Sequence, residues 1–503
     1  MAVTGDVIES EPTSPQIADT SSAESVRWVG PRRALAAIAR RPALVAFFLA
    51  LLGGLAIAVL TPPMAGGDER DHFTRAYQIS QGDLLTTRHD GVYGAYLPRT
   101  YPSEVQALTV DSFLDRDRTA FLHHLGDPAP HGPPTFVAVG NAASYGPGAY
   151  AAYAVAIAVG RLFGLSALAL LYLARVAGVV VYASLLALAV RRLPVHRWVL
   201  VACGLIPAAL NQASTVSADG VTMVLSFLLV AEAIRLVVDP QRPSRRLLIE
   251  TGAAAGFLAL AKPPYVALVL LLLWPAWRHR GTVGRALMGI FVGALALAAL
   301  WGAYQVTHSI PQNNPNAWLG GIHQSHGYAF RNLAVGRQTR YVLTHPNAFI
   351  ATIARTFAYQ GSTFPKQLFG QLALYQLPGW FVVASVALTA AACAAPDEPP
   401  QRAIPWAFRL QLLAVSLGVI LAIFAIAYTN WNAYLAPRID ALPPRYFLPL
   451  IPPLLLAVLP AGTPWARLTR APAYRVALAV GLAVVLAFAV AGLQSYHYGH
   501  PPL

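Results

Sequence analysis

Long apolar runs recur from one end of this chain to the other, and they limit the folds open to it. Of the 503 residues, 56% are hydrophobic and only 12% are charged, about half the charged share of a soluble domain. The sequence therefore predicts an all-α polytopic membrane protein with about eleven transmembrane helices, in a range of about ten to thirteen. We expect these helices at residues 42–60, 167–190, 198–214, 219–238, 247–261, 264–277, 286–306, 379–395, 406–428, 446–461 and 474–493.

Basic residues beside these runs predict the orientation of the chain in a plasma membrane. Arg27, Arg32, Arg33, Arg40 and Arg41 precede the first run, so the N-terminus is expected in the cytoplasm. The later basic loops fall on the same side only if residues 146–164 do not cross. We interpret that apolar run as an interfacial helix on the outer leaflet.

This orientation divides the chain into three parts. A disordered and basic cytoplasmic tail spans 1–41, a polytopic membrane domain spans 42–495, and a short outer tail spans 496–503. Within the membrane domain, residues 61–166 and 307–378 become long outer loops, and the first is expected to contain short helices.

The two outer loops differ in charge. Residues 61–146 carry ten Asp or Glu and six Lys or Arg, whereas 307–378 carry four Arg, one Lys and no acidic residue. The contrast favours a cleft that handles a proton on one wall and an anion on the other. Simple complementarity between the two loops is the alternative.

The stretch "GGDERDHF" follows the first apolar run and places Asp68, Glu69 and His72 where that helix leaves the membrane. Gly66 and Gly67 allow a sharp turn there. Asp68 could then lie near the bilayer surface, within reach of a reactant carried by a lipid, and act as a general base. The competing interpretation is that Asp68 caps the following helix.

Further polar residues cluster on the same expected side. In "NQASTVSADG", Asn211, Gln212 and Asp219 lie at the ends of two adjacent runs; they either line a site or hold helices together, and Asp219 could cap its own helix. In "AKPPY", Lys262 precedes Tyr265, and its ammonium either grips a phosphate or extends to the lipid headgroups.

Arg175 lies deep inside an apolar run, and "PPRYFLPLIPP" adds Arg445 and Tyr446 before the tenth run. An arginine at such depth costs several kcal/mol, so we expect Arg175 to have a partner or to face a polar cavity.

Other classes of function find no support in the residues. Both cysteines lie in apolar runs, the histidines lack metal-ligand spacing, and no nucleotide-binding motif is present. The net charge of +14 comes from arginines that flank apolar runs, so nucleic-acid binding is not expected.

Four stretches, "PPMAGGDERDHFTRAYQISQGDL", "NQASTVSADG", "KPPY" and "RYFLPLIP", resemble the bacterial membrane family known as domain of unknown function 2142. The resemblance covers about residues 42–460, and the layout is similar to that of GT-C glycosyltransferases. It implies that Asp68 is the catalytic base and that Glu69 orients a substrate. Where the family has Pro before this acidic pair and a small residue after it, Gly67 and Arg70 stand here.

The resemblance implies a GT-C-like enzyme that transfers a sugar from a polyprenyl-phosphate donor to a glycan or other cell-envelope acceptor on the outer face of the membrane. A divalent cation is used by some members of that class and not by others, so the cofactor stays open. The alternatives are a transporter or flippase of lipid-linked glycans and a non-catalytic scaffold for envelope assembly.

Overall fold

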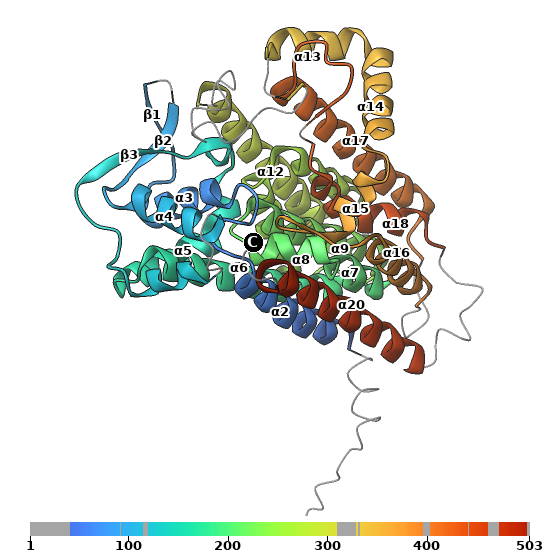
Figure 1. Ribbon diagram of the computed structural model, residues 1–503. Coiled ribbons are helices and arrows are strands. Elements are labelled where there is room, and N and C mark those ends of the chain that lie inside the picture. Colours follow the sequence, from blue (N-terminus) through green and yellow to red (C-terminus); the bar gives the residue numbers. More distant parts are fainter. Residues whose placement is uncertain are drawn as a thin grey trace, which may run out of the picture.

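The computed structural model describes residues 41–90, 92–113, 119–308, 328–329, 332–395, 403–440, 442–460 and 472–499. Its elements are mainly helices, with a small sheet at one edge of the bundle (Figure 1). The basic N-terminal stretch and the loop at 467–470, on which part of the predicted orientation depends, lie outside the described residues.

Six helices in the described part of the chain are long and apolar enough to cross a membrane. This supports a multi-pass membrane protein, as predicted, although not the count of eleven. The six are α2 (Pro42–Leu60), α6 (Ala167–Arg192), α9 (Ala218–Val238), α12 (Gly281–His308), α17 (Trp406–Trp431) and α20 (Pro472–Tyr498).

The other predicted spans are shorter or broken, mostly at prolines, which lack the N–H that continues a helix. The run at 198–214 divides at Pro207, and the run at 446–461 contains three prolines near its start. The resulting elements are α7 (Arg197–Gly204), α8 (Pro207–Ser214), α10 (Arg245–Ala259), η4 (Pro263–Leu272), α11 (Leu273–His279), α16 (Gly379–Ala394), η5 (Pro444–Leu450) and α18 (Ile451–Val458).

Residues 146–164 form η3 (Pro147–Tyr150) and α5 (Ala151–Leu162), which packs against α6. Twelve residues of α-helix measure about 18 Å, less than the ~30 Å of a hydrocarbon core. The place of this segment on the outer leaflet stays a prediction.

Helix α9 is the centre of the bundle. It is buried along almost its whole length, because α6, α8, α10, η4 and η5 pack around it. Its N-terminus is therefore surrounded by other elements and is not exposed to solvent. Helices α2 and α20 lie side by side along one flank (Figure 1).

The first long segment between spans contains short helices, as predicted, and also a sheet that was not predicted. Strands β1, β2 and β3 are antiparallel in that order, with Tyr96 opposite Phe136. The elements are α3 (Glu69–Ser80), β1 (Thr87–His89), β2 (Val92–Pro98), α4 (Tyr101–Phe113), η1 (Ala120–Gly126), β3 (Pro134–Ala138) and η2 (Gly140–Ser144).

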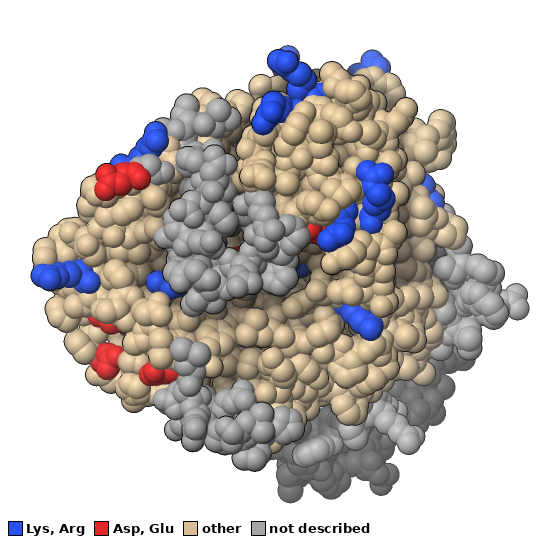
Figure 2. All heavy atoms as spheres, turned by 45° about the horizontal axis from the view of Figure 1, so that its top comes forward, with Lys and Arg blue, Asp and Glu red and all other residues tan. Residues whose placement is uncertain are grey.

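The second long segment forms α13 (Val335–Thr344), α14 (Pro346–Gln360), α15 (Thr363–Gly370), β4 (Gln371–Leu372) and β5 (Tyr375–Gln376). Figure 2 shows basic side chains over the part that carries α13 and α14, and acidic ones mainly over the first segment. Two of these basic residues contact the segment that follows α17: Arg337 stacks on Tyr434, and Arg355 donates to the carbonyl of Pro437.

Candidate active site

The backbone turns sharply between α2 and α3. Gly67 and Asp68 both have left-handed conformations, with φ of +60° and +52°. Glycine adopts this conformation at no cost, and aspartate is one of the few other residues that visit it. Gly66 packs so closely that an added Cβ would lie 2.7 Å from the side chain of Thr215. The alternative interpretation of Asp68 as a helix cap is wrong, because its carboxylate makes no capping hydrogen bond to α3. That carboxylate is directed elsewhere.

Glu69 and Arg175 form a fully buried ion pair. Arg175 Nε and Nη2 donate to the two carboxylate oxygens of Glu69 at 2.8 and 2.6 Å. The remaining donors of Arg175 bind the carbonyls of Ala58, Thr61 and Pro62 at 2.6–2.9 Å. All five guanidinium donors are therefore used, and the partner expected for Arg175 is Glu69.

Asp219 holds two cations at the N-terminus of α9. Lys262 Nζ lies 2.5 Å from Oδ1, and Arg445 Nε lies 3.0 Å from Oδ2. The alternative that Asp219 caps α9 is wrong, because Ser217 is the N-cap residue and its hydroxyl accepts from the amide of Asp219. The carboxylate of Asp219 is thus free to bind both cations.

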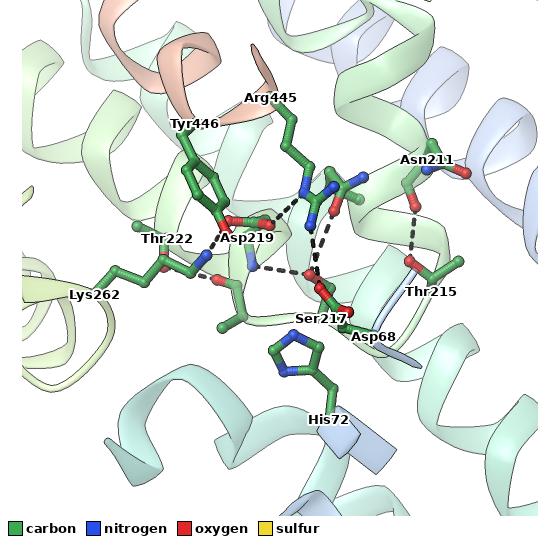
Figure 3. Close-up of polar contacts among 12 residues, drawn as sticks. Asp68, His72, Asn211, Thr215, Ser217, Asp219, Thr222, Lys262, Arg445 and Tyr446 are labelled. Carbon is green, nitrogen blue, oxygen red and sulfur yellow. Dashed lines mark hydrogen bonds and ion pairs between the residues drawn. The ribbon is translucent and has the colours of Figure 1, made fainter. Parts of the chain in front are cut away.

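Arg445 also faces Asp68, with Nη2 3.5 Å from Oδ2. Figure 3 shows Asp68, Asp219, Lys262 and Arg445 pointing toward a common centre. The Asp68 side chain is 43% exposed, whereas that of Asp219 is buried. Two carboxylates and two cations balance in charge, and Asp68 is the member most open to a reactant.

Aromatic rings surround the lysine of this cluster. Lys262 Nζ lies 4.7 Å from the ring centre of Tyr145 and 4.3 Å from that of Tyr446. These distances allow cation–π attraction. Tyr265 helps to position Tyr446, since its hydroxyl donates to the carbonyl of Tyr446 at 2.5 Å.

His72 lies beneath the cluster on α3 (Figure 3). Its ring stacks on Tyr145, and its Nδ1 lies 2.6 Å from the hydroxyl of Tyr150. Burial is the main cause that lowers the pKa of His72 to about 4; Asp68 and Asp219 oppose this shift, and Lys262 and Arg445 act in the same direction as burial. The imidazole is consequently neutral at physiological pH.

A cavity of ≈ 340 Å³ opens beside Arg445. Gln360 contributes an amide oxygen that is buried and accepts no hydrogen bond from the described residues. Such an orphaned acceptor is costly unless a ligand or water donates to it. Four glutamines from four different elements line the cavity: Gln212, Gln360, Gln367 and Gln371.

The structure brings together most of the residues predicted for the site. Asp68, His72, Asp219, Lys262, Arg445 and Tyr446 meet in one cluster, and Gln212 lines the adjoining cavity. Glu69 and Arg175 lie apart from the open site, in the buried pair. Asn211 is buried, and its amide oxygen finds no partner within the described part of the chain.

Sequence reasoning missed Tyr145 and the three glutamines at 360, 367 and 371. None of them belongs to a motif with a characteristic spacing, so only tertiary structure reveals them. Among the described residues, the single group with metal-like donor separations is Asp111, His123 and His124, on α4 and η1. None of these three belongs to this cluster.

Comparisons with known proteins give one family. The profile described as "Predicted membrane protein (DUF2142)" matches residues 51–455. Among curated proteins, no match is found.

Two solved structures also resemble this chain, both of ArnT from Cupriavidus metallidurans. The apo form is 16% identical with a TM-score of 0.34, and the form bound to undecaprenyl phosphate is 18% identical with a TM-score of 0.33. Each alignment covers 91% of this chain and 77% of ArnT. These scores are too low to transfer any property of ArnT to this chain.

Proposed function

The chain belongs to the DUF2142 family of predicted membrane proteins, and for this member we propose a glycosyltransferase activity. It takes a sugar from a polyprenyl-phosphate donor and passes it to a hydroxyl of a cell-envelope acceptor, on the outer face of the membrane. The observation that carries this proposal is the carboxylate of Asp68, which is half-exposed and faces Arg445 next to the pair of Asp219 and Lys262.

Asp68 acts as the general base. It accepts the proton of the acceptor hydroxyl while that oxygen attacks the anomeric carbon of the donor sugar. The bond between the anomeric carbon and the phosphate oxygen breaks, and the polyprenyl phosphate leaves with the electron pair. Attack from the face opposite the leaving group inverts the anomeric configuration.

Arg445 and Lys262 receive the leaving phosphate. Arg445 borders the cavity, and its contact with Asp68 is long, at 3.5 Å. A phosphate oxygen can therefore replace the carboxylate of Asp68 at Nη2. A guanidinium binds phosphate through two parallel hydrogen bonds, which an ammonium cannot do. Asp219 keeps both cations in place from the buried side.

The glutamine-lined cavity holds the transferred sugar. Its ≈ 340 Å³ falls at the lower end of ligand pockets, which measure about 300–1,000 Å³. Amide groups donate and accept hydrogen bonds, as a sugar hydroxyl requires. The orphaned oxygen of Gln360 is an acceptor for one such hydroxyl.

The other predicted residues act through these groups. Glu69 and Arg175 fix the turn that carries Asp68, because their bonds reach the carbonyls of residues 58, 61 and 62. Aromatic rings hold the cations in place: Tyr446 stacks on Lys262, Tyr265 donates to the carbonyl of Tyr446, and His72 stacks on Tyr145. Asn211, next to the cavity-lining Gln212, offers a second acceptor to which no described residue donates.

The variant Asp68→Asn tests the proposal. It keeps the shape of the side chain and removes the basic oxygen, so transfer should fall at least ~100-fold, the lower end of what a general base contributes. The assay measures lipid-linked sugars and envelope glycans in a deletion strain that expresses either variant, with membrane insertion checked by immunoblot. Full rescue by Asp68→Asn would end the assignment of the base and favour transport or scaffolding.

A further inference from the structure

We infer a zinc-binding site of Asp111, His123 and His124, separate from the cluster around Asp68. Asp111 lies in the last turn of α4, and the two histidines lie in η1. Their ligand atoms are all within 4.8 Å of one another. The site requires the folded chain, because ten residues or more separate the aspartate from the histidines in sequence.

Hydrogen bonds fix the tautomer of both histidines. The Nδ1 atom of His124 lies 2.5 Å from a carboxylate oxygen of Asp127, and Nδ1 of His123 contacts the carbonyl oxygen of Ala120. Both partners can only accept, so each Nδ1 carries the proton. In the neutral rings, each Nε2 therefore presents a lone pair.

Both of these lone pairs face the same carboxylate. Asp111 Oδ2 lies 2.9 Å from Nε2 of His124 and 3.8 Å from Nε2 of His123. A proton on Nε2 of His124 would satisfy the 2.9 Å contact as a hydrogen bond, but it would leave the lone pair of His123 facing the same carboxylate oxygen at 3.8 Å. Protonating both rings is unfavourable, because their centroids are only 3.8 Å apart, and two like charges at that distance repel strongly.

One divalent cation satisfies all three atoms. Ligands of a tetrahedral zinc ion lie about 3.3 Å apart when each bond is about 2.0–2.1 Å long, and the two measured separations bracket this value. Zinc-bound histidines usually donate their second nitrogen to a carboxylate or a backbone carbonyl. Asp127 and Ala120 supply those two acceptors.

The solvent-accessible side of the site leaves room for a fourth ligand. His123 is 63% exposed and Asp111 is 20% exposed, so water can reach the ion. Two imidazoles and one carboxylate suit zinc and its neighbours among the transition metals rather than calcium or magnesium. The bound ion would join α4 to η1, and through η1 it would brace α6.

The test measures metal in the full-length protein, purified through an affinity tag that contains no histidine. After incubation with zinc and dialysis, elemental analysis should find one zinc ion per chain. The double variant His123→Ala/His124→Ala should lose it. His89→Ala is the matched control, because His89 also lies beside an aspartate, 3.5 Å from Asp90, but in the described residues it has no third donor; it should keep the full zinc content.

Cobalt substitution gives a second readout, since a tetrahedral Co²⁺ site with histidine ligands absorbs visible light and a solvated ion hardly does. Should the double variant fail to fold, Asp127→Asn replaces it. That variant keeps all three ligands and should weaken zinc affinity about 10- to 100-fold. Wild-type protein without zinc after loading, or equal zinc and cobalt binding in wild type and both variants, would overturn the site.

Discussion

Asp68 and Glu69 are adjacent in the chain and each faces an arginine, yet their surroundings differ. The pair of Glu69 with Arg175 has no exposed surface and contacts of 2.6 and 2.8 Å. The pair of Asp68 with Arg445 is 3.5 Å long, with side chains 43% and 24% exposed. In the first pair every donor of the arginine is used, whereas in the second pair the carboxylate of Asp68 is accessible to solvent and to a ligand.

The difference follows from where each side chain points. Glu69 begins α3 and enters the space between α2 and α6, where the amide of Val216 also donates to it. Asp68 has a left-handed backbone and turns away from the helix that follows. A saturated ion pair holds backbone in place, whereas an open one keeps a carboxylate available to a reactant. Under the proposed function, this difference assigns Glu69 to positioning the turn and Asp68 to the chemistry.

The variant Arg175→Met should have the largest effect on stability. It leaves Glu69 charged and buried without its partner and removes the donors of three carbonyls. Breaking a buried pair in this way costs about 3–5 kcal/mol, so little folded protein should be recovered from membranes. Thermal unfolding in detergent measures the loss. A loss no larger than that of Arg445→Met would erase the distinction between the two pairs.

Acid should lower the stability of the folded chain by protonating His72, which lies beside the cluster of Asp68 and Arg445. The pKa of this buried imidazole is about 4 in the folded chain and about 6.5 when unfolded. The unfolded state therefore binds the proton first as pH falls, and stability is lost between pH 6.5 and 4. The loss reaches about 3 kcal/mol. In His72→Gln, the unfolding temperature should fall less steeply over this interval than in wild type. The exposed-residue variant His89→Gln, as a control, should follow the wild-type curve.

Exchanging the arginine of the open pair should affect transfer more than folding. Arg445→Lys keeps the charge and loses the bidentate geometry, which is worth about 1.5–3 kcal/mol for a charged hydrogen bond. Transfer at low donor concentration should fall about 10- to 100-fold, with the unfolding temperature nearly unchanged. Unaltered donor dependence in this variant would remove Arg445 from the phosphate site.

The smallest effect is expected in the cavity. Gln360→Leu removes an acceptor that has no partner among the described residues, so folding should be unaffected and the donor KM should rise about 3- to 10-fold. Gln81→Leu is the control, since Gln81 is exposed and does not line the cavity. Equal KM values in the two variants would argue against a sugar in this cavity.

Sequence predicted the long helices well, because apolar length alone defines them. The first span was expected at 42–60, and α2 has those bounds. The run at 198–214 was expected as one span and is two helices, since Pro207 interrupts it. Strands β1 to β3 were not expected. The pairing of β1 with β2 is a local hairpin, but that of β2 with β3, such as Gly94 with Ala138, joins residues far apart in the chain and has no local signal.

The site was only partly predictable for a similar reason. Asp68, Asp219, Lys262 and Arg445 lie at ends of apolar runs, where polar residues attract attention. Which carboxylate pairs with which cation depends on how helices pack, and no local pattern assigns Arg175 to Glu69 rather than to Asp219. Gln360, Gln367 and Gln371 lie in α14, α15 and β4, outside any motif, so their sequence context carries no signal.

The network of Arg175 also restricts motion. Its bonds to Ala58, Thr61, Pro62 and Glu69 join α2, α3 and α6 into a single rigid unit. For the proposed lipid-linked donor, we therefore expect any widening of the site on the side of α14, α15 and η5, which carry the cavity residues Gln360, Gln367 and Arg445. We expect backbone amides at 360–371 to exchange with deuterium faster than those at 58–62. If the proposed transfer activity holds, the donor lipid would then enter between one rigid side of the protein and one mobile side.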